Sequence, residues 1–329
     1  MRVFALTFGN EEAASSQYRF FQYRERLAQE GIICDHAVAA GFNDFSRLAD
    51  YDVVLHQKTL LSRLRLRQLR RNARRLVYDT DDRIWLSPQK QHHWFTRWRI
   101  ESRLRTIARQ SDLCLAANEV IAGDLRARGA KTEVVPMALD GRKWFPSDRP
   151  GEPLRIGWSG SPKNLPFLRA IGPELREVQR RFPDVEWVFH CGADPALAGL
   201  RYRHLAFVPG QEPEAVRSFH IGLLPLPDDP FVQGKSPIKA LQYLACGVAV
   251  AGAPVGATRE IIVDGQNALH ITDTGRSWVD GLTRLITLPG ERQRLAAAGR
   301  ASFLAQYDLP RVLARLKDAL VRATAPVSV

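Results

Sequence analysis

Residues 234 to 256 read Gly-Lys-Ser-Pro-Ile-Lys-Ala-Leu-Gln-Tyr-Leu-Ala-Cys-Gly-Val-Ala-Val-Ala-Gly-Ala-Pro-Val-Gly. An apolar run at 221–226 precedes them after a polar loop, and a second apolar run at 248–251 lies near their end. The apolar residues between the two runs have helical spacing: Ile238, Leu241, Leu244 and Ala245. Gly247 stands where a helix C-cap glycine belongs. The stretch therefore predicts a strand, a loop, a helix and a second strand.

The start of this helix predicts an anion site. We expect the helix to begin near Ser236, where free N–H groups and the helix dipole favour negative charge. Lys235 adds a cation there, and Gly234 lets the backbone approach a ligand closely. Lys239 follows one turn later, with Gln242 three residues further along the same face. These groups suit a diphosphate joined to a sugar; the alternative is a buried helix with a solvated basic start.

The same stretch resembles the donor-site motif of retaining GT-B glycosyltransferases of the family 4 group. The resemblance rests on Leu-Ala-Cys-Gly-Val-Ala-Val at 244–250, followed by Pro-Val-Gly at 254–256 and Glu260. Gly234 and Gln242 occupy the positions of the two glutamates in the usual motif. A branch of the group with the pattern Gly-Lys-x-x-x-Lys-x-x-Gln-Tyr is more similar. Because an amide donates and accepts hydrogen bonds, Gln242 is expected to take over part of the ribose-binding role of the second glutamate.

This resemblance implies the GT-B fold, an α/β architecture of two doubly wound Rossmann-like domains that face each other across a cleft. It implies transfer of a sugar from a nucleotide-sugar donor to an acceptor hydroxyl with retention of configuration (EC 2.4), in glycan, polysaccharide or glycolipid synthesis. The acceptor is then a glycan, a lipid-linked molecule or a small molecule. We expect no cofactor and no divalent metal. Lys235 is assigned a catalytic role, in which it stabilises negative charge on the leaving diphosphate.

The order of strand-like and helix-like segments agrees with two such domains. Alternation of this kind predicts parallel strands joined by crossover helices. It runs through residues 3–136, pauses in a segment rich in proline, glycine and charge at 140–153, and restarts at residue 154. The predicted domains are 1–145 on the acceptor side, 153–308 for the donor, and a C-terminal helix at 309–329 that crosses back onto the first domain.

Composition is that of an ordinary globular protein of two domains. The chain has 329 residues, of which 45% are hydrophobic and 25% charged, and no apolar run approaches the roughly 20 residues that span a bilayer. We interpret the N-terminus as a buried strand and not as a signal peptide. Four separated cysteines lack metal-ligand spacing and favour reduced thiols in the cytoplasm, with peripheral association at the inner membrane face as an open hypothesis.

Further donor-binding residues are predicted at the ends of strands in the second domain. The segment 157–163 closes its first strand, and the next two strands end near residues 191 and 207. The residues assigned on this basis are Gly160, Ser161, Lys163, Gly192 and Val208, because strand ends line the ligand site in this fold. For Lys163 the alternative is an exposed lysine in a tight turn.

A run of carboxylates, Asp79-Thr-Asp-Asp82, follows an apolar strand in the first domain. Buried carboxylates need N–H groups, cations or hydroxyls as partners. The run resembles the Asp-x-Asp-Asp element of the same branch on the acceptor side, so Asp81 and Asp82 are assigned catalytic roles. The acceptor-side residues are Asp79, Ser16 and Arg19. Helix capping by Asp81 or Asp82, with arginine pairing nearby, is the alternative.

The net charge of +12 is concentrated between residues 63 and 109, which carry fourteen Lys/Arg and four Asp/Glu. The arginines of 60–75 neighbour the aromatic residues Trp94, Phe95 and Trp98. One hypothesis is contact with an anionic membrane; solvated arginines on a core-facing helix are the alternative. Nucleic-acid binding through the same segment is a less favoured rival, and we expect no specific nucleic acid, since no known module is apparent. The missing glutamates leave a catalytically impaired GT-B scaffold as a rival, and an epimerase of the same fold as a weaker one.

Overall fold

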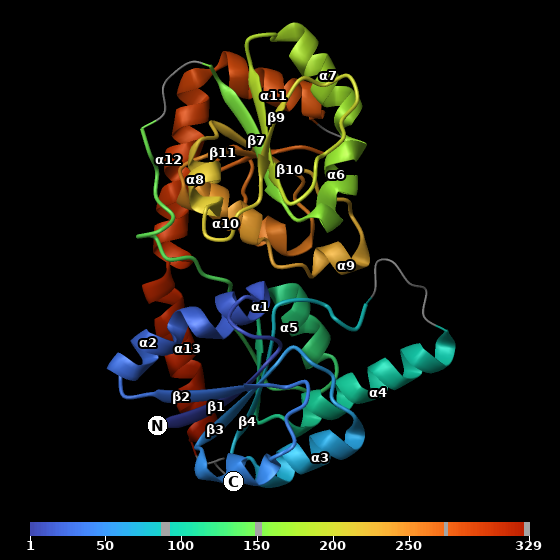
Figure 1. The fold of residues 1–329 in the computed structure, drawn as a ribbon, viewed down its shortest axis with the longest axis vertical. Helices are drawn as coiled ribbons and strands as arrows, with labels where there is room; N and C mark the ends of the chain where they lie inside the picture. The colour runs from blue at the N-terminus through green and yellow to red at the C-terminus, as the bar shows by residue number, and fades with distance from the viewer. Residues whose placement is uncertain (87–92, 149–152, 273–275, 326–329) are drawn as a thin grey trace. The chain divides into compact units, whose positions relative to one another are not determined.

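The computed structural model describes residues 1–86, 93–148, 153–272 and 276–325. The chain divides into two compact units, each of which contains a sheet with helices on both of its faces (Figure 1). Unit 1 contains Met1–Ala138, Asp229–Ser236 and Leu309–Val329, and unit 2 contains Leu139–Asp228 and Pro237–Asp308. Each unit therefore has the doubly wound α/β architecture that the sequence predicted.

Unit 1 is built on six parallel strands in the order β2-β1-β3-β4-β5-β6. The strands are β1 (Arg2–Thr7), β2 (Ile33–Val38), β3 (Val53–Gln57), β4 (Leu76–Thr80), β5 (Leu113–Ala116) and β6 (Thr132–Val134). The connecting elements are α1 (Ala14–Ser16), the wide turn η1 (Gln17–Phe21), α2 (Gln22–Gln29), η2 (Phe45–Asp50), α3 (Arg63–Asn72), α4 (Trp94–Gln110) and α5 (Glu119–Arg126). The sequence predicted six strands in this half, at 3–8, 32–37, 52–56, 76–78, 113–116 and 133–136, and all six are present.

Alternate residues of these strands face two separate cores, as the period of two in a strand requires. Phe4 of β1 and Val54 of β3 pack with the leucines of α3, α4 and α5. Val53 and Leu55 face the other way, toward α2 and a helix from the end of the chain, α13 (Leu309–Thr324). Because both faces are covered, the strands consist of nearly continuous apolar runs.

Unit 2 is built on six parallel strands in the order β12-β11-β10-β7-β8-β9. The strands are β7 (Arg155–Gly160), β8 (Glu186–Cys191), β9 (Arg203–Ala206), β10 (Ile221–Leu224), β11 (Ala249–Gly252) and β12 (Leu269–His270). The helices and short turns are η3 (Pro162–Asn164), α6 (Leu165–Ala170), α7 (Gly172–Arg181), α8 (Glu212–Arg217), α10 (Ile238–Ala245), η4 (Gly256–Glu260), α11 (Trp278–Thr287) and α12 (Pro289–Gln306). The strand β12 was not predicted, and Gly172-Pro173 divides the predicted helix at 165–182 into α6 and α7.

The boundaries of the units differ from the predicted domain limits. Unit 1 ends at Ala138, because Leu139 N–H donates to the carbonyl of Tyr307 at 3.2 Å and Gly141 N–H to the Asp308 carboxylate at 2.9 Å. Residues 149–152 of the predicted junction, and 326–329 of the predicted last segment, lie outside the described residues. A short helix, α9 (Pro230–Gln233), belongs with unit 1 although its neighbours in sequence belong with unit 2.

Candidate active site

Polar side chains gather in unit 1 where β1, β3 and β4 end. Successive connections wind in opposite directions from β1, with β2 on one side of it and β3 on the other. In doubly wound sheets, ligands bind at the carboxyl ends of the strands at such a point. The carboxamide oxygen of Gln57, at the end of β3, accepts from the Ser16 hydroxyl at 3.0 Å and from Phe8 N–H at 2.9 Å. Gln57 therefore holds the turn after β1 against the end of β3.

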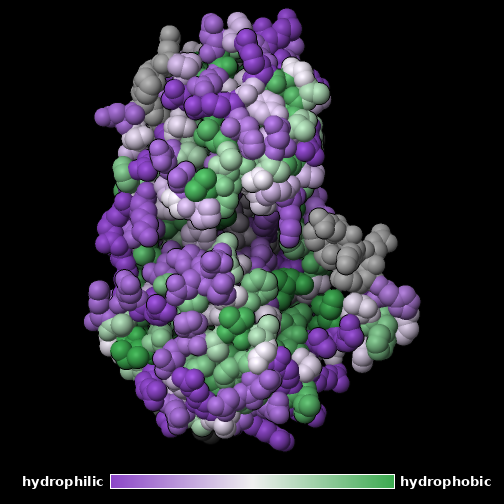
Figure 2. Space-filling model, in the orientation of Figure 1, coloured by the Kyte–Doolittle hydropathy of each residue, from purple (hydrophilic) through white to green (hydrophobic). Residues whose placement is uncertain are grey.

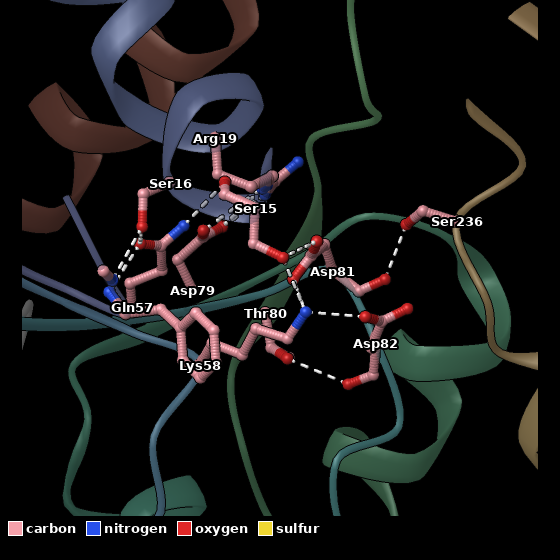
Figure 3. Close-up of polar contacts among 12 residues, drawn as sticks. Ser15, Ser16, Arg19, Gln57, Lys58, Asp79, Thr80, Asp81, Asp82 and Ser236 are labelled. Atoms are coloured by element: carbon pink, nitrogen blue, oxygen red, sulfur yellow. Dashed lines mark hydrogen bonds and ion pairs between the residues drawn. The ribbon is translucent and has the colours of Figure 1, made fainter. Parts of the chain in front are cut away.

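Arg19 and Asp79 form a buried ion pair at this edge (Figure 3). Arg19 Nε lies 3.2 and 3.1 Å from the two carboxylate oxygens, and Nη2 also contacts the carboxylate. Arg19 Nη1 donates to the carbonyl of Val135 at 2.5 Å. Burial raises the pKa of Asp79, and the guanidinium opposes only part of that shift. Because a guanidinium does not release its proton in proteins, we take the pair as ionised; it anchors the turn η1 to β4.

Lys58 is the centre of a second cluster at the same edge (Figure 3). Its ammonium lies 2.6 Å from Ser15 Oγ, 2.6 Å from Asp82 Oδ2 and 3.0 Å from Asp81 Oδ1. Its φ of 58° lies in the left-handed region, which residues with side chains seldom adopt. Backbone strain of this kind is concentrated at functional sites. One cation thus bridges the two carboxylates that the sequence assigned to catalysis.

Asp82 is the more accessible of these two carboxylates, with 26% of its side chain exposed against 6% for Asp81. Burial and then the charge of Asp81 raise the pKa of Asp82, and Lys58 opposes only part of that shift. Burial disfavours the ammonium form of Lys58, but the two carboxylates outweigh it and raise the pKa of Lys58. Asp82 is therefore the carboxylate better suited to accept a hydrogen bond from a substrate hydroxyl.

The Gly-Lys-Ser of the quoted stretch lies in segment 229–236, which packs with unit 1. Figure 3 shows the Ser236 hydroxyl donating to the Asp81 carbonyl oxygen, at 2.6 Å. The Asn118 amide donates to the carbonyl of Gly234 at 3.2 Å. The sequence placed this segment in the donor domain. The structure groups it instead with the acceptor-side aspartates, because its polar groups find their partners in unit 1.

Two residues of this segment have surroundings that differ from the expected ones. A Cβ on Gly234 would lie 2.3 Å from Cδ of Arg83, whose guanidinium is held by Asp124 at 2.8 Å. The position therefore requires glycine because of close packing. Burial lowers the pKa of Lys235, and the nearby Asp82 opposes that shift. Lys235 thus neighbours the catalytic candidate Asp82 within unit 1.

In unit 2 the winding direction changes between β7 and β10, and Tyr243 of α10 bridges these two strands. Its hydroxyl accepts from Ser159 N–H at 3.1 Å and donates to the carbonyl of Leu223 at 3.2 Å. Ser159 Oγ lies 3.0 Å from His190 Nδ1 and 3.5 Å from Lys239 Nζ. Burial and then the charge of Lys239 lower the pKa of His190, so its ring is neutral at neutral pH. A hydroxyl, an imidazole and an ammonium thus lie together at the carboxyl ends of the strands of unit 2, where donor binding was predicted.

Gln242 lies one turn from Lys239 on α10 and is 2% exposed. Within the described parts of the chain, its buried carboxamide oxygen has no hydrogen-bond partner. A buried acceptor left without a partner costs about 1 to 3 kcal/mol, and such groups in native proteins call for an explanation. A ligand hydroxyl that donates a hydrogen bond to this oxygen would explain the missing partner.

The other predicted donor-binding residues follow β7, β8 and β9. Gly160 ends β7, where a Cβ would meet the Trp158 indole at 2.2 Å. Ser161 and Lys163 are exposed in the turn that follows. The last two, Gly192 after β8 and Val208 after β9, are also exposed. The helix α10 begins at Ile238, two residues after the predicted start near Ser236.

Sequence reasoning did not assign several members of these clusters. They are Ser15, Gln57 and Lys58 in unit 1 and Ser159, His190 and Tyr243 in unit 2. A signal existed for His190, because it is a polar residue at the end of an apolar run. Ser159 and Tyr243 have no such signal, since their roles depend on which strands become neighbours.

The chain as described contains no group of three or more His, Cys, Asp or Glu residues arranged to hold a metal ion. None of its described helices is both long enough and apolar enough to cross a bilayer.

Comparisons with known proteins were made for family and for fold. Residues 156–287 match the family Glycosyl transferases group 1. A search of curated proteins found no match. Among solved structures, a sucrose-phosphate synthase from Thermosynechococcus elongatus has a TM-score of 0.74 at 13% identity, over 98% of this chain and 99% of that one. HepE from Anabaena, solved in complex with UDP, has a TM-score of 0.70 at 14% identity, over 98% of this chain and 100% of that one.

The lipopolysaccharide outer core galactosyltransferase WaaB is a third similar structure, with a TM-score of 0.65 at 14% identity over 98% of this chain and 99% of that one. At these identities the structures show a shared fold. The predicted GT-B fold and the predicted resemblance to GT-B glycosyltransferases are confirmed.

Proposed function

We propose that this protein is a glycosyltransferase that moves a sugar from a nucleotide-sugar donor to an acceptor hydroxyl with retention of configuration. The match of residues 156–287 to Glycosyl transferases group 1 and the GT-B fold support this proposal. The product belongs to glycan, polysaccharide or glycolipid synthesis on the cytoplasmic side. The donor binds to unit 2, and the acceptor hydroxyl binds to the carboxylate edge of unit 1.

The unpartnered oxygen of Gln242 is the observation that carries this proposal. A ribose hydroxyl supplies the missing hydrogen bond, while Lys239 and Ser159 lie within reach of the adjoining diphosphate. The neutral His190 and the exposed Val208 mark the strand ends where the base binds. We propose uracil as that base, because HepE, which shares the fold, was solved with UDP and with UDP-glucose.

The transfer step breaks the bond between the anomeric carbon and the diphosphate oxygen, and forms a bond from that carbon to the acceptor oxygen on the same face. The hydroxyl proton passes to the departing diphosphate. Asp82, with Asp81 and Lys58 behind it, orients the hydroxyl and polarises its O–H bond. Lys235 stabilises the negative charge that develops on the diphosphate. We propose that no divalent metal takes part, which full turnover in the presence of EDTA would support.

The test begins with binding. Wild type is heated with UDP-, GDP-, ADP-, TDP- and CMP-linked sugars, since a ligand that binds only the folded state raises the melting temperature. We expect a rise with the UDP class alone, and loss of about tenfold in affinity in Gln242→Ala, because one hydrogen bond is removed. Gln179→Ala is the matched control, as Gln179 bonds the backbone of Arg201 on another surface. Product stereochemistry, read by NMR of the anomeric proton, tests retention.

A scaffold without catalysis is the second candidate, and one observation favours it. The close contact of Gly234 with Arg83 leaves no room for the glutamate that the usual motif has at that position. Donor binding without transfer or donor hydrolysis would establish the scaffold. Absence of any shift with all five donor classes would refute the donor site itself.

A further inference from the structure

The first turns of α4 carry three aromatic side chains that are open to solvent. Trp94, Phe95 and Trp98 are 70%, 51% and 58% exposed. Their rings contact one another, with centroids 5.8 Å apart for both the Trp94–Phe95 and the Phe95–Trp98 pair. In Figure 1 this end of α4 projects away from the sheet of unit 1. An exposed apolar cluster of this kind marks an interaction site more often than a chance arrangement does.

Helix geometry separates this cluster from the core. Leu104 and Ile107 of α4 are buried in the core of unit 1. At about 100° per residue, Phe95 and Leu104 point in opposite directions from the helix axis. The aromatic residues therefore do not belong to an incompletely packed core face. The leucines of α3 behave differently: Leu66 and Leu69 are fully buried, as the core-facing alternative predicted, whereas Leu64 is 68% exposed.

Arginines surround the aromatic cluster. The two helices α3 and α4 together contain ten arginines and one glutamate, Glu101. The guanidinium of Arg63 in α3 lies 6.0 Å from the Trp98 ring centroid, which places the start of α3 beside the cluster. Within the described part of the chain, Arg70 and Arg105 alone among these ten arginines pair with a carboxylate. Figure 2 shows hydrophobic patches among hydrophilic residues in the lower half of the view, where Figure 1 draws unit 1.

Tryptophan, phenylalanine and arginine on one surface match the interface of an anionic bilayer. Aromatic rings insert at the level of the lipid headgroups, while arginines attract acidic lipids. Each basic residue near such a surface adds about 1 kcal/mol of attraction, or about a fivefold change in binding. A protein partner would need carboxylates around an apolar pocket. A bilayer of acidic phospholipid offers negative charge and apolar acyl chains over its whole surface.

We propose that the first turns of α4 and the exposed face of α3 form a peripheral membrane-binding surface for anionic phospholipid. The aromatic cluster, Trp94, Phe95 and Trp98, enters the headgroup region, and the arginines neutralise lipid phosphates around it. This inference does not depend on the proposed glycosyl transfer, because its readout is lipid binding by the protein alone.

The test is flotation of the full chain with vesicles of phosphatidylglycerol and phosphatidylcholine, compared with phosphatidylcholine alone. We expect binding to the acidic vesicles that weakens with salt. Substitution of all three aromatic residues by serine should reduce binding about tenfold or more. The matched control replaces three exposed apolar residues elsewhere, Leu288, Leu304 and Val321, by serine and should bind as wild type does.

Charge is tested separately. Arg67→Glu with Arg71→Glu should weaken binding by about 25-fold or more, since each arginine contributes about fivefold. Arg311→Glu with Arg315→Glu on α13 gives the same change in net charge on another face and should have a smaller effect. The pair Trp94→Phe and Trp98→Phe should keep binding but lose the quenching of tryptophan fluorescence by brominated lipid.

Three results would overturn the inference. They are no binding of wild type to acidic vesicles at low salt, equal binding by the aromatic variant, and unchanged quenching in the Trp-to-Phe variant. Self-association of wild type that is lost in the serine variant, without vesicle binding, would assign the surface to a second copy of the chain instead. Melting temperatures equal to that of the wild type would confirm that the variants are folded. We expect this result because the substituted side chains are exposed.

Discussion

Removal of the Lys58 ammonium is the most direct test of the cluster in unit 1. The ammonium contacts Asp81 and Asp82 at 3.0 and 2.6 Å, and Lys58 is only 7% exposed. Breaking a buried ion pair from one side costs about 3 to 5 kcal/mol, because the remaining charges are uncompensated. We therefore expect Lys58→Ala to lower the free energy of unfolding by about that amount at pH 7.

The left-handed backbone of Lys58 makes a second variant informative. A left-handed conformation costs a residue with a side chain about 1 to 2 kcal/mol, which glycine avoids. Glycine in turn loses about 0.5 to 1 kcal/mol through greater freedom of the unfolded chain. Lys58→Gly should thus be more stable than Lys58→Ala by about 1 kcal/mol, although both lack the ammonium.

The pH dependence has a defined sign. In the wild type the pKa of Lys58 is raised, so its contribution to stability is present throughout the range below 10.5 and is lost only in stronger base. In the variants the pKa of Asp82, already raised, rises further. A carboxyl whose folded pKa is raised favours the folded state at low pH and loses that effect as the pH increases. The deficit of both variants should therefore shrink between pH 7 and pH 5.

Urea unfolding at the two pH values measures these differences, with Lys317→Ala as the control. Lys317 pairs with Glu30 at the surface, where such pairs contribute little. A deficit below about 1 kcal/mol for Lys58→Ala, or one that does not change with pH, would show that the cluster is not held by charge. Equal stability of the alanine and glycine variants would refute the strain at this residue.

Two other predictions concern stability. Burial lowers the pKa of His56 to about 4, against an unfolded value of 6.5. Below pH 6.5 the ring is therefore protonated in the unfolded state but stays neutral in the folded state. The free energy of unfolding should fall by up to about 3 kcal/mol between pH 6.5 and 4. His56→Gln should flatten that part of the pH profile measured by urea unfolding. Tyr243→Phe should lower the free energy of unfolding by about 1 to 3 kcal/mol, because Ser159 N–H and the Leu223 carbonyl lose their partner; unchanged urea unfolding would mean that other groups replace the hydroxyl.

Most of the fold follows from local pattern. Apolar runs such as 52–56 and 76–78 predicted strands because strands buried on both faces have no polar alternation. The break between α6 and α7 was missed, although Gly172-Pro173, which interrupts helical hydrogen bonding, signals it. The placement of segment 229–236 was not readable, because it depends on donors from Asn118 and Arg83, which are distant in sequence.

Some residues of the candidate site could likewise be predicted from the sequence, and others could not. Asp79, Asp81 and Asp82 could be found from the run of carboxylates, and Lys239 and Gln242 from helical spacing. Lys58 could be found only by knowing that the ends of β3 and β4 are adjacent, where Gln57 stands opposite Asp79. Its left-handed backbone is set by that tertiary setting and not by its own preference, which no pattern of residue types encodes.

The division of unit 1 among three stretches of chain has a consequence for how the protein is made. Leu313, Leu316 and Leu320 of α13 complete one of its two cores, and they are translated after the whole of unit 2. The sheet formed by the first 138 residues must therefore wait, with one face only partly covered, until α13 has been made. All of unit 2 is translated in the meantime and is free to fold first. Chains that terminate early should then be recognised by chaperones and proteases through that exposed sheet, even though their second unit is complete.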